Sequence, residues 1–221
     1  MSQFCRKTMA AFALAVAASL PVAAQASEEG AELWLNPGFA FGLDDNTTLE
    51  IETAQRFRAA SKGPDTYFAR AWLVQDLSDQ LSISGAVERR VNDGAANETR
   101  LLQQLNAKSG LLRGRLRLEQ RFVDGAAQTA WRLRPRAGVN VPLNADKTWR
   151  AIADAEGFFT LRATRAGGQT GLTGLRTQLG VTHDVNDRIG LSLVYLRNQD
   201  IIDGRPDRIG HAPLFGIEFS F

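Results

Sequence analysis

Apolar and charged residues alternate with a period of two along much of the chain, and the pattern is clearest over residues 111–122. A helix would scatter the two sets around its circumference, whereas a strand places one set on each face. The segment 131–141 repeats the pattern, so both segments are predicted to be strands with one apolar and one charged face. In the first segment the apolar set is Leu112, Gly114, Leu116, Leu118 and Phe122, and the charged set is Arg113, Arg115, Arg117, Glu119 and Arg121.

Weaker copies of the alternation extend from residue 32 to the C-terminus and predict an all-β chain. After the N-terminal segment no apolar run reaches the length of about 18 residues that a transmembrane helix requires. The predicted strands cover residues 32–43, 46–58, 65–76, 80–91, 98–108, 111–123, 128–142, 148–160, 171–184, 188–199 and 208–221.

The links between these strands also alternate, because each short polar turn is followed by a longer, glycine-containing loop. Outer-membrane barrels have short periplasmic turns and longer extracellular loops. Only a closed barrel pairs every strand in lipid. The sequence therefore predicts a transmembrane, antiparallel, up-and-down β-barrel with this arrangement of turns and loops.

Outward-facing aromatic residues gather at both ends of the predicted strands, as the interfacial girdles of membrane barrels do. Trp34 and Trp72 fall on the polar parity and do not fit these girdles. The extracellular set is Phe57, Tyr67, Phe122, Trp131, Phe159 and Tyr195, and the periplasmic set is Phe39, Phe41, Trp149 and Phe221.

The expected number of strands lies between ten and twelve, and an even number is favoured because single-chain bacterial barrels have even counts. Segment 32–43 contains Pro37 and Gly38, so it is the one expected to be misdivided or to lie outside the wall. A soluble β-sandwich or lipocalin-like barrel stays open as the alternative fold; it would turn the leucines inward and the arginines outward.

The N-terminus has the features of a secretory signal peptide, with Arg6 and Lys7 before an apolar run and the small-residue site at residues 24–26 after it. We expect cleavage after Ala26, a single barrel domain over residues 27–221, and location in the outer membrane. Cleavage removes Cys5, the one cysteine, and leaves equal numbers of basic and acidic residues. Neither disulfides nor nucleic-acid binding is therefore expected.

The charged parity is predicted to line the lumen, with an excess of arginine over carboxylate. Turn positions suggest that Arg136 pairs with Asp154 and Arg134 with Glu156, and that Arg132 lies beside Glu119. The predicted basic set is Arg56, Arg58, Arg70, Arg90, Arg113, Arg115, Arg117, Arg121, Arg132, Arg134, Arg136, Arg150 and Arg176, and the acidic set is Glu50, Glu52, Glu88, Glu119, Asp154, Glu156 and Glu218.

This lumen suggests a narrow pore for small anionic or zwitterionic solutes, because clustered positive charge concentrates anions. The alternative is a plugged barrel that stabilises the envelope or displays loops, since small barrels fill themselves with side chains. An outer-membrane lipid hydrolase is the less favoured third reading, because His183 and His211 fall on the apolar parity with no matching serine. No catalytic residue, metal site or cofactor is predicted, and a monomer is favoured.

Phe215, Ile217, Phe219 and Phe221 at alternate positions resemble the C-terminal signal by which the barrel-assembly machinery recognises its substrates. The run of residues 115–121, with the charged segments around it, resembles the family catalogued as domain of unknown function twenty-four ninety. That resemblance implies a Gram-negative outer-membrane barrel in contact with membrane lipids. It brings no activity or site residue. His183 stands where the family pattern suggests an interfacial tyrosine.

Overall fold

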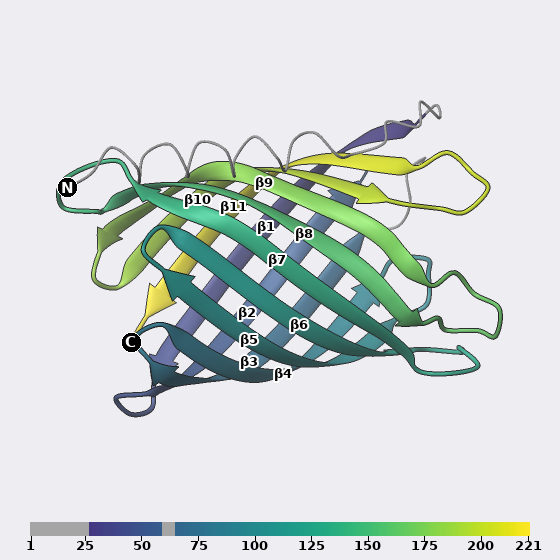
Figure 1. Ribbon diagram of the computed structural model, residues 1–221, viewed down its shortest axis with the longest axis horizontal. Coiled ribbons are helices and arrows are strands. Elements are labelled where there is room, and N and C mark those ends of the chain that lie inside the picture. Colours follow the sequence, from purple (N-terminus) through teal and green to yellow (C-terminus); the bar gives the residue numbers. More distant parts are fainter. Residues whose placement is uncertain (1–26, 59–64) are drawn as a thin grey trace, which may run out of the picture.

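Eleven strands form a closed barrel in the computed structural model, which describes residues 27–58 and 65–221 (Figure 1). No helix occurs in these residues, so the predicted all-β barrel is confirmed. The signal peptide predicted over residues 1–26 lies outside them. The strands are β1 (Glu28–Gly42), β2 (Thr47–Arg58), β3 (Thr66–Ser78), β4 (Leu81–Asn92), β5 (Glu98–Ser109), β6 (Leu112–Val123), β7 (Ala130–Pro142), β8 (Trp149–Arg162), β9 (Gly171–Asn186), β10 (Ile189–Asp200) and β11 (Arg208–Ser220).

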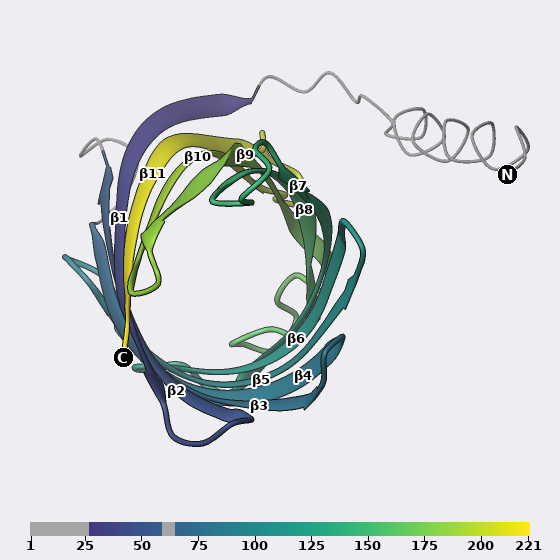
Figure 2. The same cartoon turned by 90° about the vertical axis from the view of Figure 1, so that its left-hand side faces the viewer.

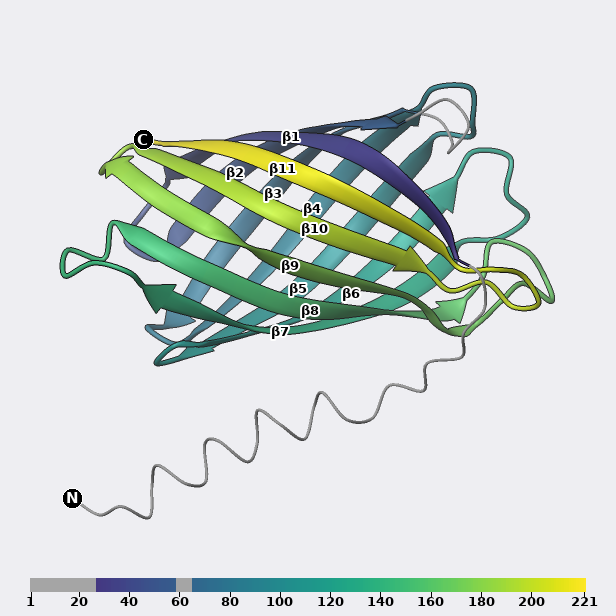
Figure 3. The same cartoon turned by 90° about the horizontal axis from the view of Figure 1, so that it is seen from above.

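The barrel closes through a parallel pairing of β1 with β11, whereas all other neighbouring strands are antiparallel (Figure 3). Across this seam Trp34 lies opposite Leu214, and Phe39 lies opposite Phe219. An odd number of strands connected up and down leaves the first and last strands running in the same direction. The eleven strands lie within the expected range of ten to twelve, but the preference for an even number and the expectation of a wholly antiparallel wall are wrong for this chain.

Strand β1 belongs to the wall although it contains Pro37. The pairing of β1 with β2 is interrupted between the Leu35–Gln55 and Gly38–Glu52 pairs. On its other side β1 remains in register with β11 through Pro37 and its neighbours. Because the proline interrupts only one of the two ladders, the strand keeps its place in the barrel.

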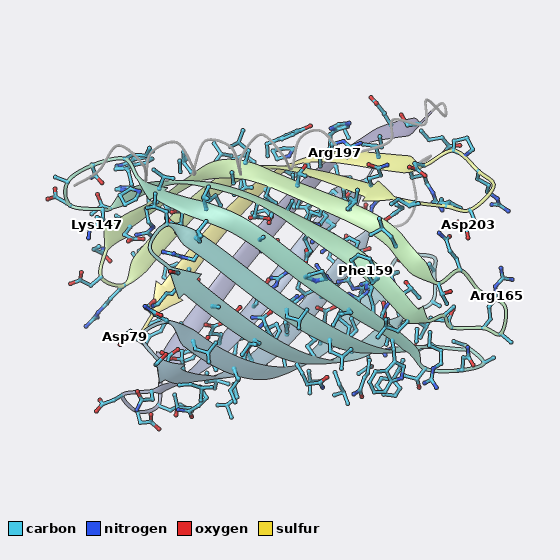
Figure 4. The ribbon with its side chains drawn as sticks, viewed as in Figure 1. Asp79, Lys147, Phe159, Arg165, Arg197 and Asp203 are labelled. Carbon is cyan, nitrogen blue, oxygen red and sulfur yellow. The ribbon has the colours of Figure 1, made fainter. Side chains whose placement is uncertain are left out.

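The two ends of the barrel differ in their connections. Figure 4 shows Asp79 and Lys147 at one end and Arg165 and Asp203 at the opposite end. Most of the short turns lie at the first end, although the link at 143–148 is longer than its companions. The turns at the first end are 43–46, 79–80, 110–111, 143–148 and 187–188, and the loops at the second end that the structure describes are 93–97, 124–129, 163–170 and 201–207.

The wall is apolar outside and charged inside. Outward leucines such as Leu105, Leu179 and Leu193 are exposed, whereas Glu88 and Glu119 are buried within the ring of strands that Figure 2 shows end-on. The alternative arrangement, with leucines inside and arginines outside, is therefore not the one observed. Only a small apolar cluster lies inside among the described residues, where Trp34, Leu196, Ala212 and Leu214 pack together.

Outward aromatic side chains pair across neighbouring strands at both ends. Toward the short-turn end Phe41 stacks on Phe221, with ring centres 5.2 Å apart. Toward the long-loop end Phe57 meets Tyr67 edge to face at 6.1 Å. Aromatic residues thus ring the exposed apolar band above and below.

Candidate functional site: the arginine–glutamate interior

Glu119 on β6 is the centre of the first charged cluster. It lies directly opposite Arg132 on β7, whose Nε and Nη2 donate to Oε2 at 2.9 and 2.6 Å. Arg134, two residues further along β7 and on the same face, donates from Nη1 to Oε1 at 2.6 Å. The carboxylate is 1% exposed, so its charge is balanced by these guanidinium groups instead of by water.

Glu156 on β8 is the centre of the second cluster. It accepts hydrogen bonds from Arg134 at 3.0 and 2.7 Å, so Arg134 joins Glu156 to Glu119. Arg115 also pairs with Glu156, and its side chain passes over β7 to do so, because Arg115 belongs to β6. Arg176 on β9 approaches the same carboxylate at 3.9 Å.

A third cluster surrounds Glu88 on β4, which is fully buried. Arg70 and Arg90 donate to this carboxylate from 2.8 and 2.9 Å. Arg100 on β5 lies 3.5 Å from it and 3.9 Å from Glu119, and so links the third cluster to the first. Glu98 completes the group by pairing with Arg100 and with the predicted lumen residue Arg121.

The sequence-based prediction omitted Arg100 and Glu98. Their parity places both inside, but the doublet Leu101–Leu102 hides the alternation on β5. Leu101 faces outward, whereas Leu102 is buried inside at 1% exposure. Counting parity back from Leu105, which is outward and exposed, would have identified both charged residues.

The predicted residues near the short-turn end are less buried. Arg136 pairs with Asp154, as predicted, but the residue directly opposite Arg136 is Glu156. The register between β7 and β8 is therefore shifted by two residues from the predicted one. As a result, the Arg136–Asp154 and Arg134–Glu156 pairs form between diagonal neighbours. Arg113 is exposed and donates to the carbonyl oxygens of Gly110 and Leu112. Arg113 therefore lies at the rim, outside the buried clusters.

Trp34 and Trp72, which did not fit the predicted aromatic girdles, point into the interior. The Arg56 guanidinium lies 3.6 Å from the centre of the Trp34 ring, and Arg176 lies 5.0 Å from the same ring. Arg117 lies 4.8 Å from the Trp72 ring. These tryptophans face arginines because the rings can hold cations by cation–π attraction where carboxylates are scarce.

Phe158 on β8 also lies against arginine side chains in the interior. Arg134 and Arg176 lie 4.5 and 5.1 Å from its ring centre. The ring covers Gly174 on β9, where a Cβ atom would come within 2.6 Å of it. A chain of arginine–aromatic contacts therefore reaches from β2 through Trp34 and Arg176 to β8, across the interior.

Cavities remain between these side chains. The central one has a volume of about 330 Å³ and is lined by eleven arginines and three carboxylates. It shares Trp34, Arg56 and Arg58 with a 190 Å³ cavity at the long-loop end. It shares Arg115 and Arg136 with a 350 Å³ cavity at the short-turn end.

The two histidines lie on the outer face near opposite ends. His183 stacks on Trp149 at 4.1 Å, and His211 accepts or donates a hydrogen bond at 2.6 Å with the Tyr195 hydroxyl. No metal-binding group of three or more ligand side chains occurs within residues 27–58 and 65–221. These residues also contain no helix that is long and apolar enough to cross a bilayer.

The C-terminal residues Phe215, Ile217, Phe219 and Phe221 lie at the parallel seam, and the first three are in register with β1. The Phe221 N–H donates to the Ala40 carbonyl at 2.9 Å, and the Gly42 N–H donates to the Phe221 carbonyl at 3.1 Å. The alternate apolar residues that resemble an assembly signal therefore also close the barrel.

Fold and interior together define a closed β-barrel that is apolar outside and cross-linked inside by arginine and glutamate. The chain belongs to the family described as "Protein of unknown function (DUF2490)", which matches residues 31–207. The match runs from β1 to the loop before β11 and includes the three charged clusters. No curated protein and no solved structure matches the chain.

Proposed function

We propose that this protein spans the Gram-negative outer membrane and provides a narrow, arginine-lined passage for small anionic or zwitterionic solutes. Export by the signal peptide, with cleavage after Ala26, and insertion by the barrel-assembly machinery through the C-terminal phenylalanines belong to the same proposal.

The outer face supports placement in a membrane. Leucines in the middle of the strands are strongly exposed, with Leu179 at 63% and Leu193 at 49%. A soluble protein seldom exposes an apolar band of this extent. The strands of 12 to 16 residues exceed the roughly 9–11 residues that a tilted strand needs to cross the hydrocarbon core. The closed wall also leaves no unpaired edge to face lipid.

The adjacency of the interior cavities, which share lining residues from one end of the barrel to the other, is the observation that carries the passage. Arg56 and Arg58 line both the central cavity and the cavity at the long-loop end. Arg115 and Arg136 line both the central cavity and the one at the short-turn end. A solute that moves between the ends would therefore pass guanidinium groups throughout.

The charge of the central cavity supports a preference for anions. Eleven arginines and three carboxylates line it, and the arginines stay in excess when the carboxylates that pair with them from outside the lining are added, namely Glu32, Glu88, Glu98, Glu119 and Asp154. Arginine stays charged at every physiological pH. In a confined space with little water this excess raises the local concentration of anions. Zwitterionic solutes can use the same groups with their negative end.

Conductance across planar lipid bilayers tests the proposal. In a KCl gradient the reversal potential should show that chloride permeates better than potassium. Arg115→Gln should reduce this preference, because Arg115 lines two of the cavities. The control is Arg89→Gln, because Arg89 is exposed and pairs with Asp124 on the outer side. A cation-selective current, or no current from correctly folded protein, would refute the passage.

A plugged barrel that stabilises the envelope is the second candidate. It is favoured by the complete burial of Glu88 and by the arginine–aromatic chain through Trp34 that crosses the interior. This candidate predicts no ionic conductance together with a high free energy of unfolding. The bilayer measurement therefore separates the two functions.

A further inference from the structure

Three arginines of the central cavity differ from the others in having no carboxylate of residues 27–58 and 65–221 at hydrogen-bonding distance. They are Arg56 on β2, Arg117 on β6 and Arg176 on β9. All three line the central cavity, although they come from distant parts of the wall.

Arg56 is the least satisfied of the three. Its guanidinium makes no hydrogen bond or ion pair with any residue in the described part of the chain, and its Nε is buried without a partner. It rests on the Trp34 ring at 3.6 Å and on Phe68 at 5.4 Å. The rings hold the guanidinium plane, but they supply no hydrogen-bond acceptor to its N–H donors.

Arg176 and Arg117 bind neutral amides instead of carboxylates. The Arg176 Nη2 donates to Asn198 Oδ1 at 3.0 Å, and Glu156 is 3.9 Å away. Arg117 donates through Nε and Nη2 to Gln104 Oε1 at 2.8 and 2.6 Å. An amide oxygen satisfies a donor but does not neutralise the charge. The three guanidiniums therefore leave positive charge in the cavity that the described side chains do not balance.

Arg56 and Arg176 also share a contact with one aromatic ring. Both guanidiniums contact the Trp34 ring, at 3.6 and 5.0 Å from its centre. Trp34 itself is fixed, since it packs on Leu196 and Ala212 and its Nε1 donates to Glu32 at 2.6 Å. Two guanidiniums fixed around one rigid ring present preorganised forks of N–H donors, which suit the oxygen atoms of an oxyanion.

We propose that the central cavity is a binding site for a multivalent oxyanion of the phosphate or dicarboxylate kind, held by Arg56 and Arg176 beside Trp34, with Arg117 adding charge. The inference rests on the proposed passage, which gives the anion access to the cavity. The volume of about 330 Å³ restricts the ligand to a small molecule. Chloride, with one charge and no array of oxygens, is held more weakly.

Binding can be measured on the folded chain in detergent micelles, without a membrane. Titration with inorganic phosphate and with succinate, followed by calorimetry and tryptophan fluorescence, should give saturable binding at concentrations where chloride has no effect. Tighter binding of phosphate or of succinate decides which kind of oxyanion the site prefers. The fluorescence change should disappear in Trp34→Phe, since that ring touches both arginines.

Arg56→Gln and Arg176→Gln should each weaken the binding about tenfold or more, because each removes a charged donor. Arg89→Gln, on the outer side, should bind as the wild type does. If a lumen variant does not fold, the wild-type titration and Trp34→Phe still decide the matter. Unchanged affinity in the folded lumen variants, or no saturable binding by the wild type, would overturn the site. Saturable binding by a barrel that conducts no ions would refute the passage and support the site. Anion current without saturable binding would refute the site and support the passage.

Discussion

Glu119 and Arg132 face each other across β6 and β7 and are joined by two hydrogen bonds of 2.9 and 2.6 Å from Nε and Nη2 to a single carboxylate oxygen. The other carboxylate oxygen binds Arg134. One acidic side chain thus holds two arginines of the neighbouring strand.

Replacing this acid should destabilise the barrel. Glu119→Gln keeps the shape of the side chain but leaves the Arg132 guanidinium without its counter-charge and removes one of the two carboxylates that bind Arg134. The expected loss is about 3–5 kcal/mol in the free energy of unfolding. Urea titration of the folded chain in lipid vesicles, followed by tryptophan fluorescence, measures it. In the matched control Asp124→Asn the lost pair with Arg89 is exposed, and the change should stay below about 1 kcal/mol. Equal losses in the two variants would contradict the burial of the Glu119 cluster.

The parallel seam can be tested by cross-linking. In a Cys5→Ala background, Leu35→Cys combined with Phe215→Cys places two thiols on residues that are Cα partners across β1 and β11. Neighbouring strands lie within the range of a disulfide, so mild oxidation should join the pair.

The control pairs Leu35→Cys with Leu193→Cys. Leu193 lies opposite Phe215 on β10 and is therefore one strand further from β1. This second pair should remain reduced because the strand separation is about twice as large. A wall of ten strands without β1 would leave both pairs unlinked.

A charge on the outer face should be costly at mid-height and tolerated at the rim. Leu179→Arg lies in the middle of β9 and should destabilise the membrane-inserted barrel by about 2–4 kcal/mol. Leu111→Arg lies in the turn between β5 and β6 and should cost about 1 kcal/mol or less. Folding equilibria in phospholipid vesicles give both values. A loss at Leu111 as large as that at Leu179 would contradict the depth assigned to them.

Parity was sufficient to predict the two faces of most strands of the wall. Arg115, Arg117 and Glu119 alternate with leucines without interruption, so the sequence alone indicates which residues share a side. The same reading failed on β5, because Leu101 and Leu102 are adjacent and only the first faces outward. A single apolar residue inside a charged lumen is enough to hide the period.

Contacts that depend on the curvature of the barrel could not be predicted. Arg115 passes over a whole strand to reach Glu156, and Arg176 reaches Trp34 from a strand that is not its neighbour. Both contacts need the wall to bend until distant side chains meet. The preference for an even number of strands had a different cause. The general rule that such barrels have even counts outweighed the alternation around Pro37, which marks that segment as a strand.

The central claim is that the leucines face lipid while the arginines face an enclosed interior. Spin labels attached to single cysteines along residues 175–182 of β9, in protein inserted into phospholipid vesicles, test it most directly. Collision with oxygen, which dissolves in lipid, should be high at positions 175, 177, 179 and 181, and collision with a water-soluble nickel chelate should be low there. Residues 176, 178 and 182 should show reduced access to oxygen; Gly180 is left unlabelled, because a Cβ atom there would clash with the Leu193 carbonyl oxygen. Equal access at both parities, or nickel collisions that peak at Leu179, would contradict the account.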